Sequence, residues 1–219
     1  MIDLRLINSE HPLKEEAVNL SSFKGIEMID YALEALLKLL DSIDARDLIF
    51  PVSGYRDKDF QRKIYQDSLK ENGLSFTLAY VALPMHSEHQ SGLAIDLSTD
   101  KDDKNIIDPE FKAEGIGKIF LDNMANYGYI LRYPKEKEVI TKIKYEPWHF
   151  RYIGYPHSKL IKIKEMCLEE YLLYLKNYTK LKPLIFENYV IYYDEKYTPN
   201  DFEISPDNCG AYIYTKEII

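Results

Sequence analysis

Residues able to bind a metal ion are concentrated in two short segments of the sequence. The first segment contains His86, His89 and Asp96, and the second contains Glu146 and His149. Two imidazoles and one carboxylate would leave one position of a tetrahedral Zn²⁺ open for water, which is typical of a catalytic rather than a structural site. Bound zinc acidifies that water and polarises a carbonyl oxygen, while an unligated carboxylate carries a proton to a leaving amine. The two segments therefore contain the parts needed for metal-assisted hydrolysis.

Each of these residues also has an ordinary structural interpretation. His89 could cap a helix or lie at the surface, and Asp96 could accept hydrogen bonds at the end of a strand. Glu146 precedes Pro147 and could belong to a turn. The spacing of the residues does not by itself decide between ligand and structural roles.

The strands expected around these residues favour their association. From Gly92 to Ser98, leucine and isoleucine alternate with small or polar residues, so a strand would direct Asp96 away from its apolar face. In residues 146–152, three aromatic residues alternate with His149 and Arg151. We therefore expect an α+β fold, with a small, mainly antiparallel sheet that carries Asp96 and His149 on one face and helices on the other.

Further elements are expected before these strands. Ser22 can cap a helix whose apolar spacing continues to residue 40, and residues 48–52 form a short apolar run typical of a buried strand. The strand delivers Arg56 to a turn. A second helix follows over residues 57–73, capped by its aspartate and ended by its glycine.

The second half of the chain shows a shift in composition. We expect a helix over residues 109–127, a strand over 129–133, a charged hairpin excursion over 135–144 and a fourth helix over 158–177. Residues 178–219 are rich in tyrosine and β-branched residues and contain turn signals. The sequence thus predicts a main domain over residues 1–177 and a small β appendage of unknown role.

Composition excludes several classes of protein. The net charge is −8 and no block of lysine or arginine occurs, so binding to nucleic acid is not expected. The two cysteines, Cys167 and Cys209, do not form a disulfide framework. No signal peptide or stretch of roughly 18 apolar residues is present. We therefore expect a cytoplasmic protein without a membrane anchor.

Taken together, two motifs resemble those of a known family. They are Ser87-x-His89-x-x-x-Gly92-x-Ala94-x-Asp96 and Glu146-x-Trp148-His149. This combination resembles the zinc D-Ala-D-Ala peptidases of the VanY and VanXY type, which belong to a wider group with lysostaphin-like and hedgehog-like folds. Further matching blocks extend the resemblance over most of residues 1–177.

The resemblance implies a role for each matched position. It implies that His89, Asp96 and His149 bind one Zn²⁺ per chain and that Glu146 is the general base. It also implies that Arg56 steadies the scissile carbonyl oxygen as negative charge develops, although an arginine on a turn is often only a surface residue.

Substrate-binding positions follow from the same resemblance. Gln61 and Ser87 correspond to the positions that hold the C-terminal carboxylate of the substrate, and Trp148 to a residue that lines the pocket and packs behind His149. Glutamine and serine at positions 61 and 87 are also common as surface or capping residues.

His157 is not one of the matched positions. It lies at the start of a helix and is expected to be structural or exposed.

By resemblance, the chain is expected to be a zinc D,D-peptidase. The expected partners are small peptides: free D-Ala-D-Ala, the pentapeptide of peptidoglycan precursors, or both. Such activity depletes the target of glycopeptide antibiotics such as vancomycin. Two alternatives stay open, an L,D-type or lytic cell-wall endopeptidase on the same fold and a zinc-binding module without catalysis, and the oligomeric state is not predicted.

Overall fold

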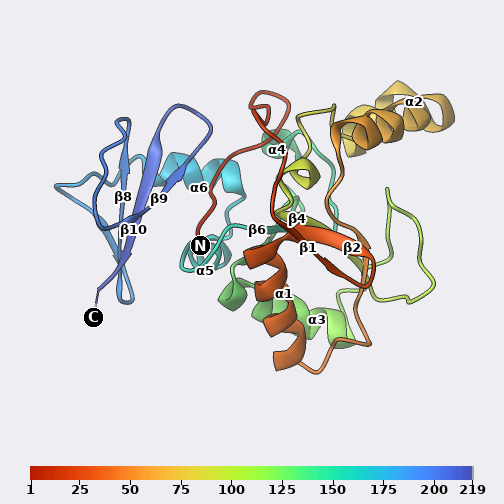
Figure 1. Ribbon diagram of the computed structural model, residues 1–219, viewed down its shortest axis with the longest axis horizontal. Coiled ribbons are helices and arrows are strands. Elements are labelled where there is room, and N and C mark those ends of the chain that lie inside the picture. The colour runs from red at the N-terminus through yellow and green to blue at the C-terminus, as the bar shows by residue number, and fades with distance from the viewer. Residues whose placement is uncertain (219) are drawn as a thin grey trace.

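A four-stranded antiparallel sheet lies at the centre of the main body of the protein. The computed structural model describes residues 1–218 (Figure 1). The central sheet has the strand order β3 (Phe50–Ser53), β4 (Ala94–Ser98), β6 (His149–Tyr152) and β5 (Tyr129–Leu131), with antiparallel neighbours throughout. The expected α+β class and antiparallel sheet are confirmed.

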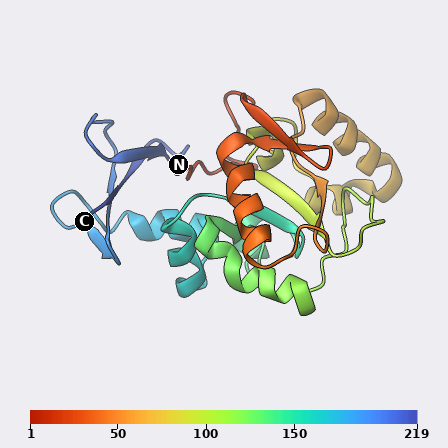
Figure 2. The ribbon, with the colours of Figure 1, turned by 60° about the horizontal axis from the view of Figure 1, so that its bottom comes forward.

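One face of this sheet is covered by helices. Helices α1 (Asp30–Ser42) and α3 (Gly115–Asn123) pack against it, and Figure 2 shows α1 lying across the sheet. The core beneath them contains the residues that the alternation assigned to the apolar faces of β4 and β6: Leu93, Ile95, Leu97, Trp148, Phe150 and Tyr152. The other face is thus left to the polar residues of both strands.

The helix expected from Ser22 begins later than predicted. Residues 20–29 form a hairpin of β1 (Leu20–Phe23) and β2 (Ile26–Ile29), and α1 starts only at Asp30. Lys24 and Gly25 both have positive φ, which matches the right-handed strand twist of a two-residue hairpin turn. This turn outweighs the helical spacing of the apolar residues in β2.

Helix α2 (Lys58–Tyr80) starts as predicted but continues beyond Gly73. The Asp57 side chain accepts a hydrogen bond from Phe60 N at 2.7 Å and caps the helix. Gly73 has φ +80°, as expected for a helix end, yet the chain resumes a helical path after the kink. A buried hydrogen bond of 2.8 Å between Ser68 Oγ and Thr77 Oγ1 joins the two parts across it.

The next helix is shorter than predicted. The chain reaches α3 only at Gly115, and a 3₁₀ turn, η2 (Met124–Tyr127), follows α3 and ends at Gly128, as expected. The preceding loop is held by its own side chains, because Asp103 Oδ2 accepts a hydrogen bond from Glu110 N at 2.6 Å. The charged excursion that follows β5 contains a single turn of helix, α4 (Glu138–Thr141), rather than a hairpin.

The predicted fourth helix is divided in two. Helices α5 (His157–Lys164) and α6 (Leu168–Leu175) are separated at Glu165, whose φ is +52°. The elements that follow are the strands expected beyond residue 178: β7 (Leu184–Phe186), β8 (Tyr189–Asp194), β9 (Glu203–Pro206) and β10 (Tyr212–Glu217).

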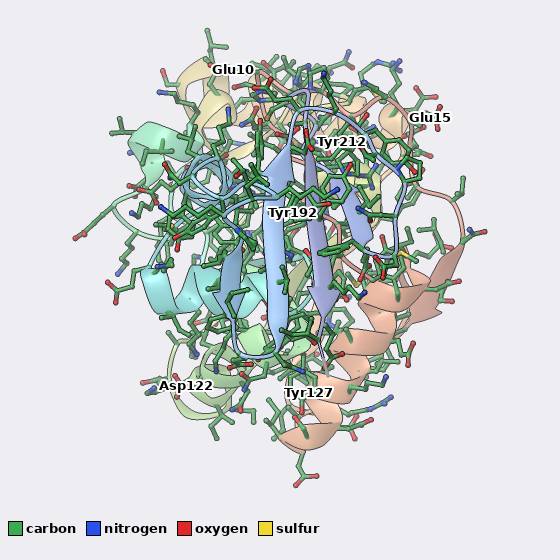
Figure 3. All side chains as sticks on the ribbon, turned by 90° about the vertical axis from the view of Figure 1, so that its left-hand side faces the viewer. Glu10, Glu15, Asp122, Tyr127, Tyr192 and Tyr212 are labelled. Atoms are coloured by element: carbon green, nitrogen blue, oxygen red, sulfur yellow. The ribbon has the colours of Figure 1, made fainter. Side chains whose placement is uncertain are left out.

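These last strands form a second antiparallel sheet, in the order β7-β8-β10-β9. Figure 3 looks onto this sheet and shows Tyr192 and Tyr212 on its strands. Its inner face packs on α5, α6 and the N-terminal segment, in a core that joins Ile191 and Ile213 to Leu160 and Leu4. Among the described residues, no helix is long and apolar enough to cross a membrane.

Candidate metal centre and active site

The two histidines and the aspartate predicted as ligands converge on the polar face of the central sheet. His89 lies on η1 (Glu88–Ser91), the 3₁₀ turn before β4, while Asp96 and His149 are directly opposite each other on β4 and β6. One ligand atom from each residue lies within 4.8 Å of the others, and all three residues are buried. The sequence pattern therefore located a real cluster.

The orientation of His89 is fixed by its second ring nitrogen. Nδ1 lies 2.6 Å from the carbonyl oxygen of Gly54 and therefore donates its proton there. Nε2 is then unprotonated and lies 3.1 Å from Asp96 Oδ2. A histidine that donates one N–H to a backbone carbonyl and presents the other nitrogen is the usual form of a metal ligand.

His149 faces Asp96 with Nδ1, whereas His89 does so with Nε2. Its Nδ1 lies 3.0 Å from Asp96 Oδ1 and 3.6 Å from Glu146 Oε2. Its Nε2 points away from this group. The two imidazole rings meet edge to face, with their centroids 4.9 Å apart.

The donor set fits a zinc ion. Ligand atoms about 2.0–2.1 Å from a tetrahedral Zn²⁺ are separated by roughly 3.3 Å, close to the contacts made by Asp96. Asp96 Oδ1 is buried and has no hydrogen-bond partner within the described residues, as expected of an oxygen reserved for a cation. Burial alone would raise the pKa of Asp96, but His89 and His149 hold it well below its ordinary value. The aspartate is thus ionised, as a metal ligand requires.

Glu146 lies beside the cluster in a different electrostatic environment. It is buried, and its Oε2 lies 3.6 Å from His149 Nδ1. Burial raises the pKa of Glu146 to about 8, since the nearby Asp96 opposes the favourable effect of His149. A carboxyl group with a pKa near neutrality can both accept and release a proton.

Arg56 also reaches the cluster. The turn after β3 brings its Nη2 to 2.6 Å from Asp96 Oδ2, and its Nε donates to Ser53 Oγ at 2.8 Å. The side chain is buried, so its guanidinium is held in one orientation beside the metal-binding atoms.

A cavity of about 40 Å³ connects these groups. Gln61, Ser87 and Trp148 line it together with the five residues described above. Gln61 Nε2 donates to Ala82 O at 2.8 Å, while its Oε1 is buried without a partner. The structure thus brings all eight residues predicted from the sequence into one site.

One buried acid at this site was not predicted. Glu88 has no exposed side-chain area and forms ion pairs with Arg132 and Arg151. The two arginines hold the pKa of Glu88 well below its usual range despite its burial. A signal for such a residue was present, because Arg151 shares a strand face with His149 and a buried guanidinium requires an acidic partner.

Two imidazoles and a carboxylate on a buried sheet face, beside a small cavity and a separate carboxyl group, are typical of a metal-dependent hydrolase. The sequence profile of the VanY family, described as D-alanyl-D-alanine carboxypeptidase, matches residues 25–155, and the chain belongs to this family.

Individual relatives agree with this assignment. The chain is 43% identical to the bifunctional D-Ala-D-Ala dipeptidase and carboxypeptidase VanXYC of Enterococcus gallinarum over 80% of its own length and 96% of the relative's. The crystal structure of the vancomycin resistance D,D-dipeptidase VanXYg, in complex with a D-Ala-D-Ala phosphinate analogue, superposes with a TM-score of 0.93. The two sequences are 39% identical, and the match covers 97% of this chain and 92% of the VanXYg chain.

A second solved structure of a relative contains zinc. It is a mutant of a D,D-pentapeptidase VanY from a VanB-type vancomycin resistance cassette, in complex with Zn(II). It is 29% identical to this chain, with a TM-score of 0.65, and the match covers 78% of this chain and 98% of that one.

Proposed function

We propose that this protein is a zinc D,D-peptidase that hydrolyses D-Ala-D-Ala, removes the terminal D-Ala from peptidoglycan precursor pentapeptides, or does both. The observation that carries this proposal is the buried group of His89, Asp96 and His149, with the separate carboxyl group of Glu146 beside it. Membership of the VanY family and the similarity to VanXYC support the substrate class.

The proposed metal site binds one Zn²⁺ through His89 Nε2, His149 Nδ1 and a carboxylate oxygen of Asp96. When bound, zinc supplies Lewis acidity that lowers the pKa of a water molecule and polarises the scissile carbonyl. Glu146 takes the proton from the attacking water and transfers it to the nitrogen of the departing D-Ala. The guanidinium of Arg56 donates to the carbonyl oxygen as negative charge develops there.

Recognition of the substrate's C-terminus is assigned to Gln61 and Ser87. The amide nitrogen of Gln61 has two hydrogens and gives one of them to Ala82 O, so the second can be donated to a carboxylate. Ser87 lines the same cavity and offers a hydroxyl donor. Trp148 closes the cavity from the core side.

We further propose that residues 1–177 carry this activity and that residues 178–219 support it structurally. By the same reasoning, the cellular role is the removal of precursors that end in D-Ala-D-Ala, which would give vancomycin resistance from the cytoplasm.

The direct test is D-alanine release by the purified protein from D-Ala-D-Ala and, separately, from a muramyl pentapeptide. We expect release from at least one substrate, its loss after chelation and its return with zinc. A muropeptide with an L,D bond at its end serves as the control. Activity on that control alone would favour the L,D-peptidase alternative, and zinc binding without any turnover would favour the noncatalytic module.

A further inference from the structure

Glu88, which lies outside the predicted ligand set, faces the ring of His149. Its Oε2 lies 3.6 Å from His149 Nε2. Both atoms are buried, and neither has a hydrogen-bond partner within the described residues. Since leaving two buried polar atoms unpaired costs free energy, a small rotation that joins them is favoured.

The other oxygen of Glu88 is already engaged. Glu88 Oε1 accepts a hydrogen bond from Arg132 Nε at 2.7 Å and lies 3.0 Å from Arg151 Nη1. Both arginine side chains have no exposed area. These contacts fix the position of the carboxylate and leave Oε2 directed at His149.

The arginines are themselves anchored to other parts of the chain. Arg132 forms two hydrogen bonds with Glu169 on α6, at 2.7 and 2.9 Å. Arg151 Nη2 lies 3.6 Å from Asp3 in the N-terminal segment. Each arginine therefore has an acidic partner outside the central sheet in addition to Glu88.

The placement of Glu88 determines which nitrogen of His149 carries a proton. An ionised carboxylate only accepts hydrogen bonds, so the nitrogen that faces it must be N–H. That nitrogen is Nε2. Nδ1 faces the ionised Asp96 in the same way, so it would also be N–H unless a cation lies between Nδ1 and Asp96. With a metal bound there, the single remaining proton of the ring is held on Nε2 by Glu88. The Gly54 carbonyl does the same for His89, where the proton sits on Nδ1.

We propose that Glu88 is the positioning residue for His149, holding its proton on Nε2 so that Nδ1 is free to bind the metal. This inference rests on the zinc centre of the proposed function.

A pair of matched variants tests the inference. Glu88→Gln removes the charge that faces His149, while Glu169→Gln removes a carboxylate from the same arginine without touching the ring. Zinc affinity is measured by competition with a chromophoric chelator, at a temperature where circular dichroism shows each variant to be folded. We expect zinc affinity to fall about 10–100-fold in Glu88→Gln and to stay close to the wild-type value in Glu169→Gln.

Two results would overturn the inference. One is unchanged zinc affinity in Glu88→Gln, and the other is an equal loss in both variants, which would indicate a general effect of disturbing Arg132. If the wild-type protein itself failed to bind zinc, the proposed function would fail as well. The two failures are thus distinguishable.

A measurement on the unaltered protein covers the case in which Glu88→Gln does not fold. Nitrogen-15 NMR of the histidine rings reports which nitrogen of each ring is protonated. Of the two rings that respond to zinc, we expect one to bind through Nε2 and the other through Nδ1 with a proton on Nε2. Binding of both rings through Nε2 would contradict the role given to Glu88.

Discussion

At the scale of single residues, Asp96 and Glu146 are two buried carboxyl groups whose pKa values are shifted in opposite directions. Asp96 contacts both imidazoles and the guanidinium of Arg56, so its ionised form is stabilised. Glu146 contacts His149 only at 3.6 Å, and burial raises its pKa to about 8. Environments that shift the pKa values of two neighbouring carboxyl groups apart are typical of active sites in which the two groups have different roles. Here the roles are metal ligand for Asp96 and proton carrier for Glu146.

Replacing Glu146 with glutamine separates metal binding from proton transfer. Because the amide cannot take up a proton, we expect kcat to fall by about 10²–10⁴-fold. Zinc content should stay near one ion per chain, since the three ligands are untouched. Metal analysis and steady-state kinetics on the same preparation check both expectations, with Glu71→Gln, an exposed glutamate on α2, as the control. Loss of zinc together with activity would make Glu146 a ligand instead.

The role of Arg56 can be tested with a substitution that keeps the charge. The planar guanidinium of arginine can donate hydrogen bonds to Ser53, Asp96 and the developing oxyanion at the same time, and the ammonium of lysine cannot. Arg56→Lys should therefore lower kcat by about 10²–10³-fold. The KM for D-Ala-D-Ala should change much less. Arg62→Lys, at an exposed position on the helix that follows, α2, is the matched control. An effect confined to KM would indicate that Arg56 binds the ground state rather than the transition state.

Residue-level prediction succeeded where chemistry and strand alternation coincided. Asp96 and His149 could be paired from sequence because each lies opposite an apolar strand face. Glu88 could not, because it precedes His89 in an irregular turn and nothing local distinguishes it from an exposed glutamate. Its charge is compensated in the interior by Arg132, which follows β5, and by Arg151 of β6, and both are distant from it in sequence.

At the scale of secondary-structure elements, the turn η1 connects the ligand His89 to the strand that carries Asp96. It ends at Gly92, whose φ is +67° and whose N–H donates to His89 O at 3.0 Å. A Cβ at this position would meet Ala17 Cβ at 3.1 Å and the backbone nitrogen of Ile29 at 3.1 Å. The separation of the two ligands therefore depends on a residue without a side chain.

Gly92→Ala should consequently affect both stability and metal binding. Gly115→Ala provides the control, since Gly115 also has a positive φ, +54°, but a Cβ there meets nothing within 4 Å. Backbone strain of about 1–2 kcal/mol is expected in both variants, and Gly92→Ala should lose further stability through crowding. Urea unfolding and zinc competition measure the two effects. Equal destabilisation with unchanged zinc affinity would show that η1 has room to adjust.

The elements that sequence reasoning misplaced share a cause. Residues 26–29 have apolar spacing compatible with the following helix, but the turn at Lys24 and Gly25 pairs them with β1 instead. Residues 109–114 are in a loop because hydrogen bonds such as Glu110 N to Asp103 Oδ2 compete with a helix. In both places a short-range turn outweighed periodicity, whereas helix ends marked by glycine, as at Gly128, were predicted correctly.

At the scale of the whole molecule, the C-terminal sheet is joined to the rest of the chain through a shared core. Residues of β8 and β10 pack with those of α5, α6 and the N-terminal segment. Leu4 N also donates to Ser205 Oγ of β9 at 2.7 Å. The change in composition at residue 178 was visible in the sequence, but the return of the first residues to this sheet was not, because it depends on contacts between the two ends of the chain.

A buried histidine lies at this junction and makes it sensitive to pH. His157 Nδ1 lies 2.7 Å from the Tyr171 hydroxyl on α6, and Nε2 lies 2.8 Å from Thr215 Oγ1 on β10. The sequence predicted a structural or exposed residue, and the structural alternative is correct. Burial lowers the pKa of His157 to about 3 from its ordinary value of 6.5, so the unfolded chain takes up a proton at mildly acidic pH that the folded protein excludes.

The sign of the effect follows from this difference in proton uptake. The stabilising contribution of neutral His157 is complete above pH 6.5 and is lost as the pH falls from 6.5 towards 3, by about 1.4 kcal/mol per pH unit. Glutamine at this position can keep both hydrogen bonds but does not titrate. The stability difference between wild type and His157→Gln should therefore shift by about 2 kcal/mol in favour of the variant between pH 7.5 and 5. Urea unfolding at both pH values, with chelator present so that zinc binding does not contribute, measures this shift, and a difference that does not change with pH would mean that His157 is protonated in the fold.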